Sequence, residues 1–264
     1  MIRILFVGDI MGSAGRGAVR RHLEELVDRE RVDFVIANVE NAAGGFGITS
    51  EVLAELEVYP VDVWTTGNHV WDKKEGVPLL DAHPALLRPA NYPEGNPGRG
   101  WCIEETAAGV PVAVINLQGQ AMMPPIDNAF RKADEVLEAI RAARPELRLI
   151  VVDMHAEATS EKQAMGWYLD GRVTAVLGTH THVPTADERI LPQGTAFQTD
   201  VGMTGPYESI IGMKPAKVLE RFLLNTPRPF EPAKRGIELR GALIDADEAT
   251  GKATAIRRVT IKAD

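Results

Sequence analysis

The sequence predicts one α/β domain, spanning residues 1–264, with an antiparallel portion near its C-terminus. In the first half, short apolar runs alternate with helix-like stretches, a rhythm typical of parallel strands joined by right-handed crossovers. Towards the C-terminus, two segments alternate apolar and polar residues around a turn, which indicates a β-hairpin. We find no repeat, low-complexity tract or linker that would divide the chain into separate domains.

The N-terminal elements form an expected β-α-β-α-β unit. Nothing polar interrupts Ile4–Val7, so this run is predicted to be a strand buried on both faces. A helix capped at Ser13 follows, with apolar residues at helical spacing up to Val27. A shorter helix begins at Ser50. The other two strands are expected at 34–37 and 61–65.

The later elements follow an irregular loop at 84–100, which is rich in proline and glycine. A helix is expected from about 127 to 143, with Asp127 as its N-cap. The expected strands are 101–105, 110–116, 149–152, 173–177 and the hairpin pair 237–245 and 253–261, around the turn Ala249-Thr250-Gly251.

Composition excludes several classes of protein. The 29 basic and 37 acidic residues give a net charge of −8, which argues against a DNA-binding surface that neutralises phosphates. The single cysteine, Cys102, can form no intramolecular disulfide and fits a reducing, cytoplasmic compartment, where we expect it to be a small buried apolar side chain. No apolar run approaches the roughly 18 residues that span a bilayer, and the first residues do not have the pattern of a secretory leader.

Five of the predicted strands end in side chains that can bind a metal ion. Four of the chain's six histidines fall at such positions, whereas His22 lies in a helix and His83 in a loop. The carboxyl ends of parallel strands border the crevice where ligands bind, so we expect these side chains to converge. The candidates are Asp9, then Glu40 and Asn41, then Asn68 and His69, then His155, and finally His180 and His182.

This donor set favours a pair of metal ions. Mixed oxygen and nitrogen ligands suit iron, manganese or zinc. Two close cations repel each other and need an anionic ligand between them, for which Glu40 is the natural candidate. Metal ions about 3.5–4 Å apart can acidify a shared water and clamp a phosphoryl oxygen, so the sequence predicts phosphoester hydrolysis by a metal-bridging hydroxide.

The same motifs resemble those of the calcineurin-like metallophosphoesterases. Gly8-Asp9, Gly67–His69, the single His155 and Gly178–His182 correspond to the usual DxH, GNH, single-His and GHxH motifs of that superfamily. The resemblance implies a β-sandwich of mixed sheets flanked by helices, in four layers α/β/β/α.

The departures from the usual pattern are similar to those of the YmdB-like branch. Met11 stands where the pattern has a histidine, Val70 replaces the acid after GNH, and Asn38–Asn41 replaces the GDxxD block. The segments 41–47 and 199–205 add to this similarity, which runs from Asp9 to about Met213.

The resemblance also implies a role for each candidate. His69 would not bind metal but would protonate the leaving alkoxide as a general acid. The branch further implies cyclic nucleotides, including 2′,3′-cyclic nucleotides, as substrates, a cytoplasmic location and self-association into a homo-oligomer. The first ion would take Asp9, Glu40, Asn41 and His182, and the second would take Glu40, Asn68, His155 and His180.

Several alternatives stay open. A binuclear amidohydrolase would use similar ligands on carbonyl substrates, and a non-catalytic regulatory module could keep the metal ions for recognition.

The geometry of some segments is also expected from the sequence. If the segment 180–182 is extended, the side chains of His180 and His182 point to the same face. Gly12, Gly15 and Gly17 could help to bind a substrate phosphate, and the loops 42–47 and 199–207 could contact the substrate. The residues Trp71, Trp101 and Trp167 could either stack on a base or pack in the core.

Overall fold

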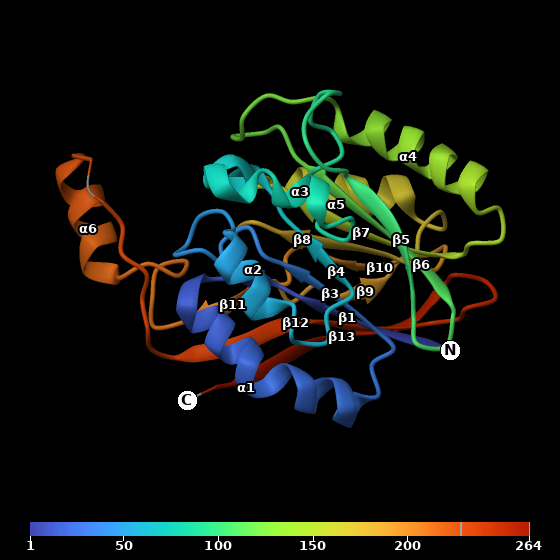
Figure 1. Cartoon of the computed structure of the whole chain (residues 1–264), viewed down its shortest axis with the longest axis horizontal. Helices are drawn as coiled ribbons and strands as arrows, with labels where there is room; N and C mark the ends of the chain where they lie inside the picture. The colour runs from blue at the N-terminus through green and yellow to red at the C-terminus, as the bar shows by residue number, and fades with distance from the viewer. Residues whose placement is uncertain (228, 264) are drawn as a thin grey trace.

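A computed structural model describes residues 1–227 and 229–263, and in it two β-sheets pack face to face with helices on both outer sides (Figure 1). The first sheet has the strand order β2 (Asp9–Ile10), β11 (Met203–Pro206), β12 (Ile237–Ala246), β1 (Ile2–Val7), β3 (Phe34–Asn38) and β4 (Val63–Thr65), with β13 (Ala253–Lys262) paired to β12. The second sheet has the order β5 (Trp101–Glu105), β6 (Pro111–Gln118), β7 (Leu149–His155), β8 (Ala175–Thr179), β10 (Ala196–Gln198) and β9 (Arg189–Ile190).

Both sheets are mixed, as the resemblance implied. In the first sheet β1, β3 and β4 run parallel, while β12 is antiparallel to β1, β11 and β13. In the second sheet β6, β7, β8 and β10 run parallel, and an antiparallel strand closes each edge. The expected hairpin of β12 and β13 is confirmed.

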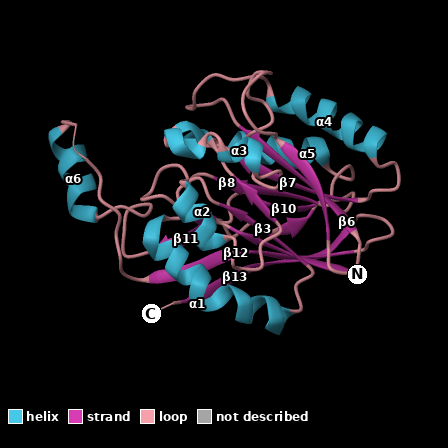
Figure 2. Ribbon diagram, in the orientation of Figure 1, coloured by secondary structure: helices cyan, strands magenta, loops and turns pink. Residues whose placement is uncertain are grey.

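The packing of apolar side chains on both faces of each sheet accounts for the four layers. Alternate side chains of a strand point to opposite faces, so Ile4 and Phe6 of β1 lie in the apolar core between the sheets. Leu5 and Val7 lie instead under helices α1 (Gly12–Glu30) and α2 (Ser50–Leu56). On the outer face of the second sheet, residues of β6 and β7 pack under α4 (Ala129–Ala143) and α5 (Thr159–Leu169). The arrangement is therefore the expected α/β/β/α sandwich (Figure 2).

Several predicted boundaries are wrong, and the strand expected at 173–177 is β8, which begins at Ala175 and ends at Thr179. Helix α1 begins at Gly12, so Ser13 lies inside it and caps nothing. The N-cap of α4 is Asn128 rather than Asp127, because its side chain accepts the N–H groups of residues 130 and 131. Strand β4 begins at Val63, since residues 61 and 62 complete the preceding turn.

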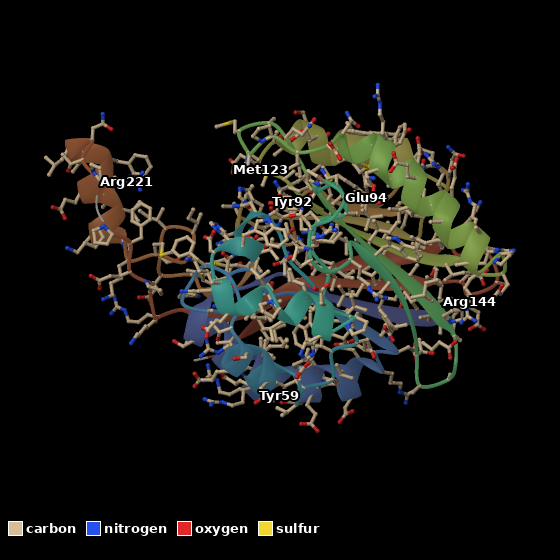
Figure 3. All side chains as sticks on the ribbon, turned by 45° about the horizontal axis from the view of Figure 1, so that its top comes forward. Tyr59, Tyr92, Glu94, Met123, Arg144 and Arg221 are labelled. Atoms are coloured by element: carbon tan, nitrogen blue, oxygen red, sulfur yellow. The ribbon has the colours of Figure 1, made fainter. Side chains whose placement is uncertain are left out.

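Several elements were not predicted. Helix α5 has a weak apolar period because its inner face carries the fully buried Lys162 as well as Gly166. Helix α6 (Pro215–Leu224) stands apart from the body of the molecule, and Arg221 marks it in Figure 3. The remaining ones are short: β2, β9, β10, β11, the 3₁₀ helices η1 (Asn68–Trp71) and η2 (Lys74–Gly76), and α3 (Leu79–Ala82).

None of the helices in the described part of the chain is both long and apolar enough to cross a membrane. Cys102 is buried on β5, as expected.

Candidate metal centre

All of the predicted site residues lie at the carboxyl ends of strands, and the structure brings them together from both sheets. From the first sheet, Asp9 follows β1, Glu40 and Asn41 follow β3, and Asn68 and His69 open η1 after β4. From the second sheet, His155 is the last residue of β7, and His180 and His182 follow β8. The sandwich therefore brings the carboxyl ends of strands from both sheets to a common edge.

One group of side chains surrounds the amide of Asn41. The Nδ2 atom of Asn41 lies 3.1 Å from Nε2 of His182, 3.2 Å from Oε1 of Glu40 and 3.3 Å from Oδ1 of Asp9. The side chains of Asp9, Glu40 and Asn41 are buried, and that of His182 is nearly so. A single donor nitrogen thus sits among three acceptors, and a cation in its place would require the amide to turn its Oδ1 atom towards the group.

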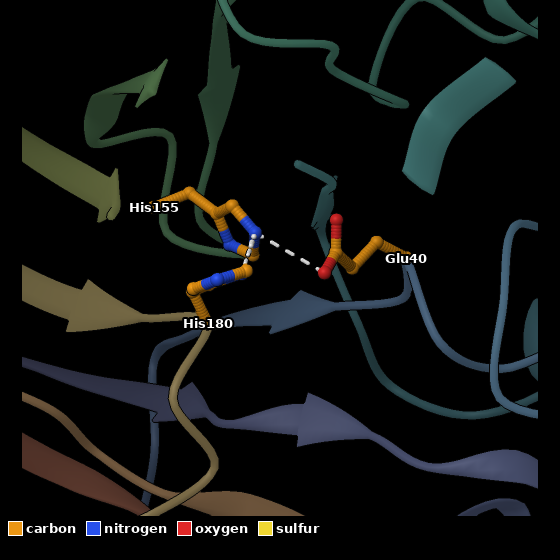
Figure 4. Close-up of side chains that lie close together, drawn as sticks. All are labelled: Glu40, His155 and His180. Atoms are coloured by element: carbon orange, nitrogen blue, oxygen red, sulfur yellow. Dashed lines mark hydrogen bonds and ion pairs between the residues drawn. The ribbon is translucent and has the colours of Figure 1, made fainter. Parts of the chain in front are cut away.

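A second group surrounds the imidazole of His155. Its Nε2 atom lies 3.1 Å from Oδ1 of Asn68, 3.1 Å from Nδ1 of His180 and 3.1 Å from Oε1 of Glu40. Figure 4 shows Glu40 and the two histidines facing one another. These two groups coincide with the two predicted ligand sets, and Oε1 of Glu40 belongs to both.

Hydrogen bonds to Nδ1 of His155 and of His182 determine which ring nitrogen of each faces the site. Nδ1 of His155 donates to Oγ1 of Thr179 over 2.8 Å, and the Thr179 hydroxyl donates to Asp153 over 2.6 Å. Nδ1 of His182 donates to the carbonyl of Ile211 over 3.0 Å. Both Nε2 atoms are therefore directed into the site, the orientation that outer partners impose on metal-binding histidines.

The carboxylates of the site attract positive charge, which His155 supplies in part, while burial and the charge of His155 lower the pKa of His180 to about 3. Burial raises the pKa of Asp9, and among the described residues its ion-pair partner is a histidine rather than a lysine or arginine. Burial also opposes ionisation of Glu40, yet His155 outweighs it and lowers the pKa of Glu40 to about 2. Conversely, burial lowers the pKa of His155, but the carboxylates of Glu40 and Asp9 raise it to about 9. Buried carboxylates need compensating cations, which is what metal ions supply.

Gly67 leaves the space in which the two groups meet. A Cβ atom at this position would lie 2.2 Å from the ring of His155 and 2.4 Å from Oε2 of Glu40. Any side chain here would displace a candidate ligand. Only glycine therefore fits at the position before Asn68.

The expectation of an extended His180-Thr181-His182 segment is wrong. The two histidines have φ of 94° and 65°, and β8 has already ended at Thr179. Their rings therefore do not share a face, and each joins a different group. Oδ2 of Asp200 holds the turn between them, because it accepts the N–H of Thr181 over 3.2 Å and its hydroxyl over 2.7 Å.

A buried ion pair supports this turn, and sequence analysis missed it. Nζ of Lys162, which is fully buried in α5, lies 2.7 Å from the same Oδ2 of Asp200. In the sequence, Asp200 was noted only as part of the segment 199–205, which resembles the YmdB-like branch. That resemblance did not indicate that Asp200 pairs with Lys162.

His69 lies beside both groups but belongs to neither. Its backbone N–H donates to Oε2 of Glu40 over 3.1 Å, and its Nδ1 lies 2.8 Å from Oδ2 of Asp72. The ring of Phe46 meets the His69 ring edge-on, with centroids 4.9 Å apart. Asp72 was not anticipated, although its place three residues after His69 in a helical turn could have indicated the pair.

Other candidates lie elsewhere or have packing roles. Met11 is buried against Met203 and Met213, in an apolar cluster rather than among the oxygen and nitrogen ligands. The loop 42–47 contributes Gly45 and Phe46 to the pocket over the site, whereas residues 199–207, the helix glycines and the tryptophans contribute nothing to its lining.

Comparison with known proteins agrees with this geometry. The family described as YmdB-like protein matches residues 5–259. A protein of Bacillus subtilis strain 168 named 2′,3′-cyclic-nucleotide 2′-phosphodiesterase is 49% identical over 263 residues, which cover 100% of this chain and 98% of that protein.

Two crystal structures are also similar. A hypothetical protein from Thermus thermophilus superposes with a TM-score of 0.92 at 42% identity, over 100% of both chains. A novel phosphatase of Mycoplasma pneumoniae superposes with a TM-score of 0.91 at 34% identity, over 99% of this chain and 93% of that one. The chain therefore belongs to the YmdB-like protein family, as its resemblance to that branch of the metallophosphoesterases implied.

Proposed function

We propose that this protein is a phosphodiesterase that uses two metal ions, iron or manganese by preference and zinc as an alternative. Its substrates would be small nucleotide-like phosphodiesters such as 2′,3′-cyclic nucleotides. The observation that carries the proposal is the pair of donor groups that share Oε1 of Glu40 beside the His69 imidazole. The printed name of the Bacillus subtilis relative supports the same reaction.

The residues present fit such a metal pair. Both donor groups consist of carboxylate, amide and imidazole atoms, and Glu40 supplies the anionic ligand between two positive charges. When bound, paired ions of this kind acidify water and offset charge on phosphoryl oxygens. The ligands would be Asp9, Glu40, Asn41 and His182 for one ion, and Glu40, Asn68, His155 and His180 for the other.

His69 would act as the general acid. Since Asp72 accepts the proton on Nδ1, the imidazolium form of His69 would donate the proton on Nε2 to the leaving alkoxide oxygen and become the neutral ring. The bond from the His69 N–H to Oε2 of Glu40 fixes the distance between this acid and the metal-binding groups.

The expected cellular context follows from the family resemblance and the composition. We propose that residues 1–264 act as one domain in the cytoplasm, as a homo-oligomer, and that the partner of the site is a small-molecule phosphoester.

His69→Ala tests the general acid. A general acid contributes about 10²–10⁴-fold when the leaving group is poor, and far less when it leaves unaided. The variant should therefore lose much more activity on 2′,3′-cyclic AMP than on an activated aryl phosphodiester. It should also keep its metal content, measured by elemental analysis. Equal losses on the two substrates would remove His69 from this role.

A panel of substrates separates the alternatives. Metal-loaded protein should hydrolyse bis(p-nitrophenyl) phosphate and leave an activated amide intact. Hydrolysis of the amide alone would indicate an amidohydrolase. Bound metal without any turnover on the panel would indicate a regulatory module.

A further inference from the structure

The pocket over the metal-binding groups has two chemically different halves. It encloses about 480 Å³, a volume typical of small-molecule sites. Its floor carries the polar groups already described, Glu40, Asn41, His69, His180 and His182. Its walls are apolar and are built mainly by Phe46, Val183, Ile211, Val218, Phe222 and Phe230.

Phe46 is held in an exposed position by its neighbours. It lies in a loop where Gly44, Gly45 and Gly47 all have positive φ, between 71° and 100°. A Cβ at Gly45 would lie 3.0 Å from Cε of Met11, and one at Gly47 would lie 2.7 Å from Cγ of Lys73, so the loop is packed on both sides. The packed backbone therefore presents the Phe46 ring to the pocket, next to His69.

Helix α6 forms the opposite wall. Val218 is buried against the cluster of Met11 and Met213, which anchors the first turns of the helix. Phe222, four residues later, lies on the same face of the helix and lines the pocket, although 78% of it is exposed. The guanidinium of Arg221 lies 4.9 Å from the centre of the Phe230 ring and joins α6 to the segment that follows it.

The walls offer no side chain suited to reading the edge of a base. Among the described residues that line the pocket, the polar side chains have partners at the floor: the amide of Asn41 contacts Asp9, Glu157 pairs with Nε2 of His180, and the Thr181 hydroxyl donates to Asp200. A ligand bound there would gain from burial and aromatic contact rather than from hydrogen bonds to its edge.

We infer that the apolar half of this pocket binds the aromatic base of the substrate while the phosphodiester lies over the polar floor, with Phe46 and Phe222 as the residues that hold the base. The inference rests on the proposed function and narrows it. The substrates would be phosphodiesters that carry an aromatic base, with little preference for which base it is.

Two five-membered cyclic phosphodiesters, one carrying a nucleoside and one without base or ribose, test this subsite. Phe46→Ala and Phe222→Ala should lower kcat/KM for 2′,3′-cyclic AMP about ten-fold, mainly through KM. Phe222→Ala should leave kcat/KM for glycerol 1,2-cyclic phosphate within about two-fold, and Phe46→Ala, whose ring contacts His69, should lower it by much less than it lowers the nucleotide value. Leu223→Ala is the matched control, since Leu223 is exposed on the same helix and does not line the pocket. Equal losses on both diesters, or no loss on the nucleotide, would overturn the inference.

A comparison of substrates with different bases tests the subsite a second way. The 2′,3′-cyclic forms of AMP, GMP, CMP and UMP should have kcat/KM values within about ten-fold of one another, because each base has a face that can stack. A preference for one base of about 10⁴-fold would show hydrogen-bond reading and would contradict the inference.

Calorimetry distinguishes failure of the inference from failure of the proposed function. If neither diester is hydrolysed, the phosphodiesterase proposal fails. The affinity for adenosine 3′-monophosphate still tests whether the apolar walls bind a base. Phe46→Ala and Phe222→Ala should weaken that binding about ten-fold and leave binding of inorganic phosphate unchanged. Unchanged binding of the nucleotide would reject the base subsite.

Discussion

At the scale of single residues, Glu40 is the centre of the site. Its Oε1 atom lies among both donor groups, and its Oε2 atom accepts the backbone N–H of His69. One side chain thus links the two proposed metal positions to the proposed acid. The sequence indicated this role because only Glu40, in the altered Asn38–Asn41 block, could replace the bridging carboxylate of the resemblance.

Glu40→Gln should therefore remove both metal ions together. The glutamine amide keeps the shape of the side chain but lacks the negative charge that two cations require. Activity should therefore fall by more than the 10–100-fold that is typical when a residue hydrogen-bonded to a ligand is replaced. Asp153→Asn provides the comparison, because the hydrogen bond of Asp153 reaches His155 through Thr179 and Asp153 is not a proposed ligand. Elemental analysis should find close to two ions per chain in the wild type and few in Glu40→Gln. Retention of two ions by the glutamine variant would refute a shared carboxylate.

Cys102 should be unreactive in the folded protein. Burial raises the pKa of its thiol from 9.0 to about 12, and only the thiolate is a good nucleophile. The unfolded chain ionises this thiol at lower pH than the folded one, so the stability that Cys102 contributes is present below pH 9 and decreases as the pH rises from 9 towards 12. Labelling with a thiol reagent at pH 8 should be slow in buffer and fast in denaturant. Rapid labelling of native protein would contradict the buried position.

At the scale of elements, the turn after β8 depends on a contact between two residues that are not among the proposed metal ligands. Thr181→Val removes the hydroxyl bond to Asp200 but keeps the shape of the side chain. The left-handed backbone at His180 and His182 then loses support, and we expect metal affinity to fall about 10–100-fold, as for outer partners. Thr181→Ser, which keeps the hydroxyl, should restore the affinity. If the valine variant binds metal as the wild type does, the turn does not need this bond.

The elements that could be predicted are those whose own residues determine them. Ile4–Val7 and the other uninterrupted apolar runs are buried on both faces, which is a local signal of a strand between two layers. Helix α5 escaped prediction because Lys162 pairs with Asp200, which lies in a distant segment. The extended geometry assumed for His180–His182 failed for the same reason, since the Asp200 contact sets the turn.

At the scale of the whole molecule, the family resemblance supplied what periodicity alone did not. Alternating strands and helices predict an α/β domain, but not that a second sheet packs on the first. That packing matters for function, because Glu40 comes from the first sheet and His155 from the second. Of the pocket walls, the sequence indicated the loop 42–47 but not helix α6, since Phe46 and Phe222 are far apart in the chain and line one pocket only through the fold.

The most direct test of the account is anomalous diffraction from crystals of the protein loaded with manganese or iron. We expect two peaks about 3.5–4 Å apart on either side of Oε1 of Glu40, one near Asn41 and His182 and the other near His155 and His180. A single peak, or peaks away from these side chains, would contradict a site in which two cations share one glutamate.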